Sequence, residues 1–320
     1  KKSIDPALAF GINEMVVCAT AYQPWTDKIP GNTVGGHISG SFNRNHTTWN
    51  YSRQFWDYQA RNSYVLRQGK PHSDLCIYLG ENPPVKIYTY RLPDIPAGTD
   101  FDAFSTNALL TRMDVKNGNI VLPDGVSYRM MALPRNGELT LEALKKIASL
   151  VYKGASVYGP KATYSRSQRD AGNEKEYTAL ANKLWGAHPA TSGFGKYGSG
   201  VVYWGMSLAE AMQKAGIIKD VSMKTGNTKE SGINFIHRKM ADGDLYFLYN
   251  NKGKAEDNVF TFASTGKNAQ LWDPLTGKRF SLIPGLSDKH TTMIPLYMNP
   301  NEAYFVLITD KKETLPPVHW

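Results

Sequence analysis

Gly11-Ile12-Asn13-Glu14-Met15-Val16-Val17-Cys18 becomes continuously apolar from Met15 onward, and a long polar segment follows it up to Trp49. A continuous apolar run is typical of a parallel strand that is covered on both faces. The polar segment spans roughly 30 residues, whereas the usual connection has about 4–6, and loops of that length are usually functional or disordered. Its aromatic residues argue against disorder. We therefore expect a buried strand that opens into a functional loop.

The polar loop combines flat aromatic rings with amide, hydroxyl and guanidinium groups. Such a mixture suits a sugar, whose CH faces stack on aromatic rings while its hydroxyls need directed donors and acceptors. An irregular packed loop without a ligand explains this stretch alone equally well. The substrate-binding residues that we predict are Tyr22, Gln23, Trp25, Arg44, Asn45, Thr48 and Trp49.

The composition is that of a folded globular protein. The 320 residues are 41% hydrophobic and 12% aromatic, which excludes a disordered chain and allows two or three domains. No apolar run approaches the ~20 residues of a membrane span, so no membrane span is expected. The chain begins at Lys1 without a methionine or a signal-peptide core, so we expect a mature form or a fragment.

The net charge of +9 is spread along the chain rather than gathered in one block. Diffuse basic charge favours anionic partners, among them acidic polysaccharide and nucleic acid. No signature of a nucleic-acid-binding module accompanies it, so we expect no nucleic-acid partner.

Cysteine, histidine and glycine patterns do not indicate a cofactor. Cys18 and Cys76 lie in separate apolar runs, so we expect two unpaired, buried thiols. The seven histidines are scattered without an i, i+4 pair, which predicts no metal site built on histidine. The stretch 193–198 matches G-x-G-x-x-G, but a strand is expected after it rather than before it, so we reject a nucleotide site.

The chain in order predicts three units, a multidomain combination of α/β and all-β structure. Residues 1–82 alternate helix and strand, and a proline-rich junction follows them. Residues 83–228 contain βαβ units and predict a doubly wound, flavodoxin-like α/β domain. Residues 229–320 contain only short strands separated by turn signals, which predicts an antiparallel β-sandwich. In the first unit we expect helices at Asp5–Phe10 and Tyr51–Arg67 and a strand at Ser73–Gly80.

Carboxylates are scarce where glycoside chemistry would need them. Hydrolysis of a glycoside usually requires two carboxyl groups that flank the scissile bond. The acidic residues before residue 90 are Asp5, Glu14, Asp27, Asp57, Asp74 and Glu81. Of these, Asp27 alone lies in the long loop, and one carboxylate does not complete the pair.

Short segments spread over nearly the whole chain match a known family in order. They are Ala9–Asn13, Gln23–Trp25, Pro30–Gly31, Phe42–Asn45, Thr48–Trp49, Tyr64–Gly69 with Asp74, Leu122–Arg129, Gly154–Ala155, Gly159–Pro160 and Leu271–Gly277. In these segments the chain resembles the α-L-rhamnosidases of glycoside hydrolase family 106. The resemblance implies that residues 1–82 form the last part of a (β/α)8 catalytic barrel. The chain departs from the family at Cys18, Tyr22 and Asn50, where changed specificity or weakened activity is implied.

The resemblance further implies that the catalytic acid and base, with a calcium-linked part of the substrate site, lie upstream of Lys1. The expected function is therefore glycoside hydrolysis of a rhamnose-containing, acidic polysaccharide in the periplasm or outside the cell. This chain is expected to be a C-terminal part that is inactive alone and has the N-terminal part of the same protein as its partner. The alternative is a non-catalytic carbohydrate-binding or scaffold protein derived from such an enzyme.

Overall fold

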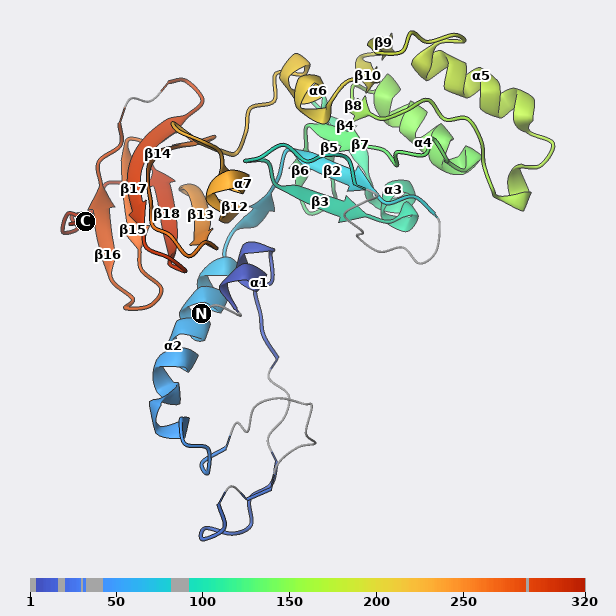
Figure 1. Ribbon diagram of the computed structural model, residues 1–320. Coiled ribbons are helices and arrows are strands. Elements are labelled where there is room, and N and C mark those ends of the chain that lie inside the picture. Colours follow the sequence, from blue (N-terminus) through green and yellow to red (C-terminus); the bar gives the residue numbers. More distant parts are fainter. Residues whose placement is uncertain are drawn as a thin grey trace.

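The computed structural model describes residues 4–16, 21–29, 31–32, 43–81, 92–285 and 288–319. Figure 1 shows a helical N-terminal segment, a central α/β unit and a C-terminal β unit, with the described residues 21–29 lying away from both units. Among the described residues, every helix is too short or too polar to cross a lipid bilayer.

The two N-terminal helices pack on the C-terminal β unit. Helix α1 (Asp5–Ala9) and helix α2 (Ser52–Leu66), which follows the 3-10 turn η1 (Trp49–Tyr51), match the predicted helices. Leu8 and Leu66 are fully buried in one apolar cluster with Phe247 and Phe305 of the β unit. The Tyr58 hydroxyl of α2 donates a hydrogen bond of 2.6 Å to Asp5 Oδ1 of α1. Apolar burial and this bond fix α1 and α2 relative to each other.

The strand predicted from Met15 is not formed within the described residues. Residues 12–16 have no strand pairing, and the Val16 side chain is 92% exposed rather than buried. A strand is stabilised by hydrogen bonds to its neighbours, and no described strand pairs with this segment. Val17 and Cys18 lie outside the described residues.

The central unit is a mostly parallel sheet with helices on both faces. Its strand order is β3-β2-β7-β8-β10-β9, in which only the edge pair β10–β9 is antiparallel. Without β9 this is the 2-1-3-4-5 order of flavodoxin-like sheets. The strands are β2 (Leu75–Tyr78), β3 (Phe101–Phe104), β7 (Met130–Ala132), β8 (Ser156–Tyr158), β9 (Gly193–Tyr197) and β10 (Gly200–Trp204).

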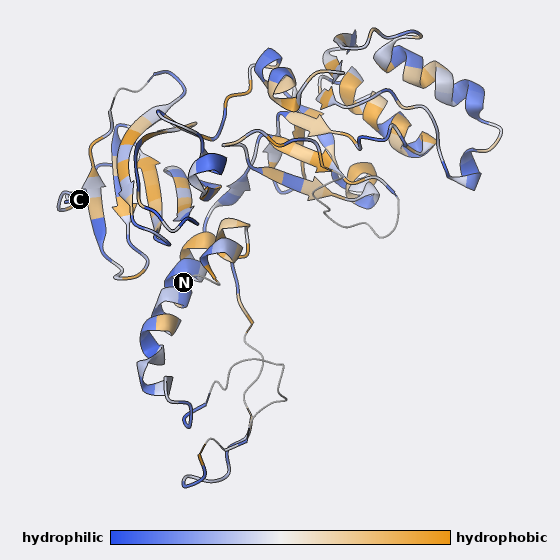
Figure 2. Ribbon diagram, viewed as in Figure 1, coloured by the Kyte–Doolittle hydropathy of each residue, from blue (hydrophilic) through white to orange (hydrophobic). Residues whose placement is uncertain are grey.

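Helices α3 (Thr106–Arg112), α4 (Leu141–Tyr152) and α5 (Glu174–Trp185) share one apolar cluster, and α6 (Leu208–Lys214) belongs to another. Figure 2 shows the hydrophobic residues concentrated along the central strands and α4, while α5 is more hydrophilic. Both α4 and α6 are capped at their N-termini: Thr140 Oγ1 accepts from Ala143 N, and Ser207 and Glu210 form a capping box.

A small antiparallel sheet, β4 (Asp114–Lys116), β5 (Asn119–Val121) and β6 (Ser127–Tyr128), borders this unit. Its first turn is an Asn117-Gly118 hairpin, in which both residues have positive φ, as a type I′ turn requires. The 3-10 turn η3 (Gln168–Asp170) precedes α5.

The strand predicted at Ser73–Gly80 belongs to this central sheet, not to the first unit. β2 pairs in parallel with both β3 and β7, so the boundary that we predicted at 82/83 falls inside a sheet unit. All four residues of β2 are buried. A fully buried parallel strand has the same pattern in a barrel and in a doubly wound sheet, which is why the sequence did not distinguish them.

The glycine motif at 193–198 forms edge strand β9 and the turn that follows it. A side chain on Gly193 or Gly195 would press against the Trp204 indole ring on the neighbouring strand. The glycines therefore serve the packing of Trp204.

The C-terminal β unit has two antiparallel sheets, β1-β12-β13-β18-β15-β16 and β11-β14-β17. Residues of both sheets, such as Tyr246, Val306, Phe260 and Ile294, share one apolar cluster. The short strands expected within residues 229–320 are present. The strands are β1 (Lys70–His72), β11 (Val221–Met223), β12 (Ile233–Met240), β13 (Gly243–Asn250), β14 (Glu256–Phe262), β15 (Asn268–Trp272), β16 (Arg279–Leu282), β17 (Thr292–Met298) and β18 (Ala303–Thr309), with the short helix α7 (Thr228–Ser231) before β12.

Two of these strands come from sequence before residue 229. β1 pairs with β12, and β11 pairs with β14, so the predicted boundary at 228/229 does not coincide with the sheet pairing either. After β1 the chain crosses to the central sheet in two residues, Ser73 and Asp74. The buried Ser73 hydroxyl bonds the Leu75 and Asp100 carbonyls, and the Asp74 carbonyl accepts from Arg129 N at 2.8 Å. This crossing is therefore held tightly.

Candidate functional site

The predicted sugar-binding loop is held together by its own polar side chains. Arg44 Nη2 donates to the carbonyls of Gln23 at 2.8 Å and Trp25 at 3.1 Å. The Gln23 side-chain amide donates to the Asn32 carbonyl, and its Oε1 accepts from Asn32 N at 2.9 Å and from Asn45 Nδ2 at 3.2 Å. Gln23 is buried within this network. The donors of Gln23, Arg44 and Asn45 thus stabilise the loop itself.

The aromatic residues of the loop remain available to solvent. Tyr22 is 80% exposed, Trp25 is 40% exposed and Trp49 is 38% exposed. The Lys28 ammonium lies 4.5 Å from the centroid of the Trp25 ring. The structure therefore presents Tyr22 and Trp25 on a backbone that the loop network holds in place.

Thr48 and Trp49 lie where the loop runs into α2. Thr48 Oγ1 is 2.7 Å from His46 Nδ1, and Trp49 begins the 3-10 turn η1. The structure joins Gln23, Trp25, Arg44 and Asn45 through the loop network, whereas Thr48 and Trp49 belong to the helix entry. Asp27 is exposed and is the one carboxylate in the sequence between residues 21 and 49.

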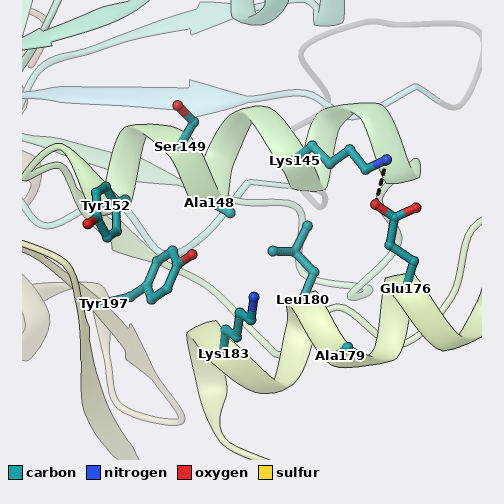
Figure 3. A pocket seen from close by; sticks show the side chains of 9 residues that line it. All are labelled: Lys145, Ala148, Ser149, Tyr152, Glu176, Ala179, Leu180, Lys183 and Tyr197. Carbon is teal, nitrogen blue, oxygen red and sulfur yellow. Dashed lines mark ion pairs between the residues drawn. The ribbon is translucent and has the colours of Figure 1, made fainter.

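A groove between α4 and α5 is a second surface feature, which the sequence did not indicate. It has a volume of about 460 Å³ and is lined by Lys145, Ala148, Ser149, Tyr152, Glu176, Ala179, Leu180, Lys183 and Tyr197. Figure 3 shows the Lys145–Glu176 ion pair, 2.7 Å long, at one end and the two tyrosine rings at the other. It lies on the central unit, far from the loop (Figure 1).

A buried charged cluster lies where the chain crosses between the two sheet units. His237 of β12 is central: its Nδ1 is 3.0 Å from Asp220 Oδ1, and its Nε2 is 2.7 Å from Asp244 Oδ1. Asp244 also accepts from Ser264 Oγ at 2.6 Å and pairs with Lys239 Nζ at 2.6 Å. The His237 side chain is fully buried.

Two further groups complete the cluster. His72 of β1 lies opposite His237 in the β1–β12 pair, with ring centroids 4.5 Å apart. On the other side, the Tyr246 ring stacks on His237 at a centroid distance of 4.1 Å. His72, Asp220 and His237 offer ligand atoms that all lie within 4.8 Å of one another.

The environment shifts the pKa values of this cluster in opposite directions. Burial, assisted by His237, lowers the pKa of His72 to about 4. Burial opposes charge on His237 as well, but its hydrogen bonds to Asp220 and Asp244 outweigh that effect and raise its pKa. Burial raises the pKa of the neighbouring Asp74 to about 6 and that of Asp100 to about 7. The surroundings therefore disfavour charge on the His72 imidazole and favour it on the His237 imidazole.

Local sequence patterns carried no signal for this cluster. His72 and His237 are far apart in the sequence, and the i, i+4 spacing that we searched for describes helices. The register of β1 on β12 brings them together, and β1 is a short, exposed strand containing Pro71. Cys76, as predicted, is an unpaired and buried thiol, whereas Cys18 lies outside the described residues.

Comparison with known proteins gives the class of protein. Residues 1–283 match the model of glycoside hydrolase family 106, described as alpha-L-rhamnosidase. The chain belongs to this family. It is also similar to a putative beta-glucuronidase of Formosa agariphila, with 32% identity over 311 residues, which cover 96% of this chain and 25% of the relative.

Two solved structures have a similar fold. A rhamnosidase from Novosphingobium sp. PP1Y aligns over 100% of this chain and 30% of its own, with a TM-score of 0.89 and 28% identity. This likeness confirms a mixed α/β fold with several antiparallel sheets. A β-galactosidase from Bacillus circulans sp. alkalophilus aligns over 83% of this chain and 46% of its own, with a TM-score of 0.51 and 10% identity, a likeness of fold alone. The chain thus spans a quarter to a third of the first two relatives.

Proposed function

We propose that this chain is the C-terminal part of an α-L-rhamnosidase and that its long loop contributes to the sugar site. The observation that carries this proposal is the loop network, in which Arg44 and Gln23 hold the backbone while Tyr22 and Trp25 stay exposed. A held backbone with exposed aromatic rings lowers the ordering cost of binding a sugar. The family membership supplies the reaction, hydrolysis of a rhamnoside.

Several finer expectations join this proposal. Residues 1–66 would form the end of the catalytic barrel, and the two antiparallel sheets of the β unit would form a β-sandwich on which α1 and α2 pack. The catalytic acid and base would belong to regions of the relatives that this chain does not cover. Asp27 has no second carboxylate beside it in the loop sequence, so the chain alone is expected to lack turnover. A polysaccharide substrate would place the protein in the periplasm or outside the cell.

A uronic acid substrate is the second candidate because one relative is named as a putative beta-glucuronidase. A sugar carboxylate needs a cation with free donors. Arg44 is engaged by backbone carbonyls, and Lys28 lies over Trp25. We therefore place a neutral sugar such as rhamnose first on the family match, which is described as alpha-L-rhamnosidase. A non-catalytic binding protein is the third candidate, and it shares the same loop site.

Titration calorimetry of the full chain with L-rhamnose, D-glucuronate and their oligosaccharides tests the loop. We expect weak binding of the rhamnose series, reduced at least tenfold by Trp25→Ala. The matched control is Tyr152→Ala, which removes an aromatic ring that is 61% exposed but lies on the remote groove. Equal loss in both variants, or preferential binding of glucuronate, would contradict the proposed site.

The expectation that this chain alone does not hydrolyse a rhamnoside is tested separately. Aryl α-L-rhamnoside hydrolysis is measured with this chain alone and with a longer protein that includes the region the relatives have in addition. We expect turnover only from the longer protein. Turnover by this chain that Asp27→Asn abolishes would show that the acid and base lie in this segment. No turnover from the longer protein, together with intact sugar binding, would favour the binding protein.

A further inference from the structure

Three potential metal ligands meet at the crossing between the central unit and the β unit. His72 ends β1, His237 lies opposite it on β12, and Asp220 directly precedes β11. Their ligand atoms lie within 4.8 Å of one another, and Asp220 and His237 are buried. Two imidazoles with one carboxylate form a donor set that suits zinc and similar divalent transition metals, rather than calcium or magnesium.

The surroundings of His237 match those of a metal-bound histidine. Such a histidine usually donates its second ring N–H to a carboxylate, which fixes the tautomer and the ring orientation. Here Asp244 Oδ1 lies 2.7 Å from His237 Nε2, and Ser264 and Lys239 hold the same carboxylate in place. With the proton on Nε2, the Nδ1 lone pair points at Asp220 Oδ1, 3.0 Å away. Two electron-rich atoms at that distance need a cation between or beside them, either a proton on Nδ1 or a metal ion.

Two observations favour a metal ion over a proton alone. Among the described residues, His72 lies in contact with His237 but makes no close hydrogen bond; its nearest ionic partner, Asp74 Oδ1, is 3.9 Å away, which leaves its ring nitrogens able to bind an ion. Within the part of the chain that the structure describes, the fully buried Tyr246 hydroxyl has no hydrogen-bond partner. The Tyr246 ring stacks on His237 at a centroid distance of 4.1 Å, so this residue borders the cluster. A buried polar group without a partner calls for an explanation such as a bound ion or water.

We propose that His72, Asp220 and His237 bind one divalent transition-metal ion, for which Zn²⁺ is the probe. A tetrahedral zinc ion with bonds of about 2.0–2.1 Å holds its ligand atoms roughly 3.3 Å apart. Since the three atoms lie within 4.8 Å of one another, the largest gap closes by at most about 1.5 Å. The His72 side chain, which is 22% exposed, is the ligand with room to rotate.

The site is structural because it joins both places where the chain passes between the units. His72 is followed within a few residues by β2 of the central sheet, and Asp220 leads from α6 into β11 of the β unit. An ion bound to both segments and to β12 would hold the two units together. The proposal does not depend on the proposed sugar site.

Calorimetry of the metal-stripped full chain with Zn²⁺ tests the site, with Ca²⁺ as the oxygen-preferring control. We expect one Zn²⁺ per chain, no comparable Ca²⁺ binding and a higher Tm in the presence of Zn²⁺. His72→Ala and Asp220→Asn should each weaken Zn²⁺ binding at least tenfold. Asp220→Asn keeps the size of the side chain and a hydrogen-bonding group, so it separates loss of a ligand from loss of the fold. The matched control is His290→Ala, which removes an exposed histidine.

Absorption of the Co²⁺-substituted chain gives a second readout. A tetrahedral nitrogen and oxygen site gives an intense visible spectrum, and His72→Ala should change it. The proposal is overturned if the stripped chain binds no Zn²⁺, because His237 is then simply protonated between two carboxylates. It is equally overturned if Zn²⁺ binds with the same affinity to the wild type and to both ligand variants.

Discussion

The loop around Gln23 and the cluster around His237 are both polar networks, but they differ in what holds them. In the loop, Arg44 and Gln23 bond mainly to backbone groups nearby in the sequence, and the segment is largely exposed. In the cluster, His237 bonds to carboxylates brought from different strands and loops, and the groups are buried. The loop is therefore a local structure that can change without the fold, whereas the cluster depends on the fold and supports it.

The strongest test of this difference is His237→Ala. It leaves Asp220 and Asp244 without their shared partner, and removal of one partner from a buried charged pair costs about 3–5 kcal/mol. We expect a loss of that size in the free energy of unfolding, measured by urea denaturation of the metal-stripped chain. His290→Ala, at an exposed position, should change stability by less than about 0.5 kcal/mol. A loss below about 1 kcal/mol for His237→Ala would mean that the cluster does not support the fold.

The matching test of the loop is Arg44→Met. It removes the donor that holds the carbonyls of Gln23 and Trp25, and the exposed position keeps the cost near about 1 kcal/mol. We expect limited proteolysis after Lys28 to become roughly fivefold faster, with no change in the urea midpoint. Arg53→Met, which removes an exposed arginine paired with Asp57 on α2, is the control. A shift of the global unfolding transition would show that the loop is coupled to the fold after all.

Sequence patterns predicted those structural elements that are determined by residues close together in the sequence. The C-terminal strands follow from alternation and turn residues, and the α4 cap follows from Thr140. The sequence did not predict that Leu75–Tyr78 belongs to the central sheet, because a buried parallel strand has the same pattern in a barrel and in a doubly wound sheet. The strand expected from Met15 did not form within the described residues, because strand formation depends on a neighbouring strand rather than on the run itself.

The same distinction applies to the candidate sites. The loop residues were recognisable because aromatic and amide side chains lie close together in one segment, although their division into network residues and exposed rings required the structure. The histidine cluster was missed because its contacts come from the register of β1 on β12. Lys70-Pro71-His72 is short, exposed and contains a proline, which are poor signs of a strand.

The smallest effect on stability is expected for Lys239, which lies at the edge of the buried cluster. Lys239 belongs to the cluster through Asp244, yet its side chain is 47% exposed. Exposed ion pairs contribute about 0.2–1 kcal/mol because water and salt screen them, and Asp244 keeps its bonds from His237 and Ser264 when Lys239 is removed. We therefore expect Lys239→Met to lower the free energy of unfolding by less than about 1 kcal/mol, with the difference fading at high salt.

Lys254→Met, at another exposed lysine of the β unit, is the control for the change in net charge. Urea denaturation of both variants at low and high ionic strength measures the difference. A loss of several kcal/mol that persists in high salt would place Lys239 inside the buried network rather than at its border. Lys239 would then be a group that depends on the fold rather than one that water can replace.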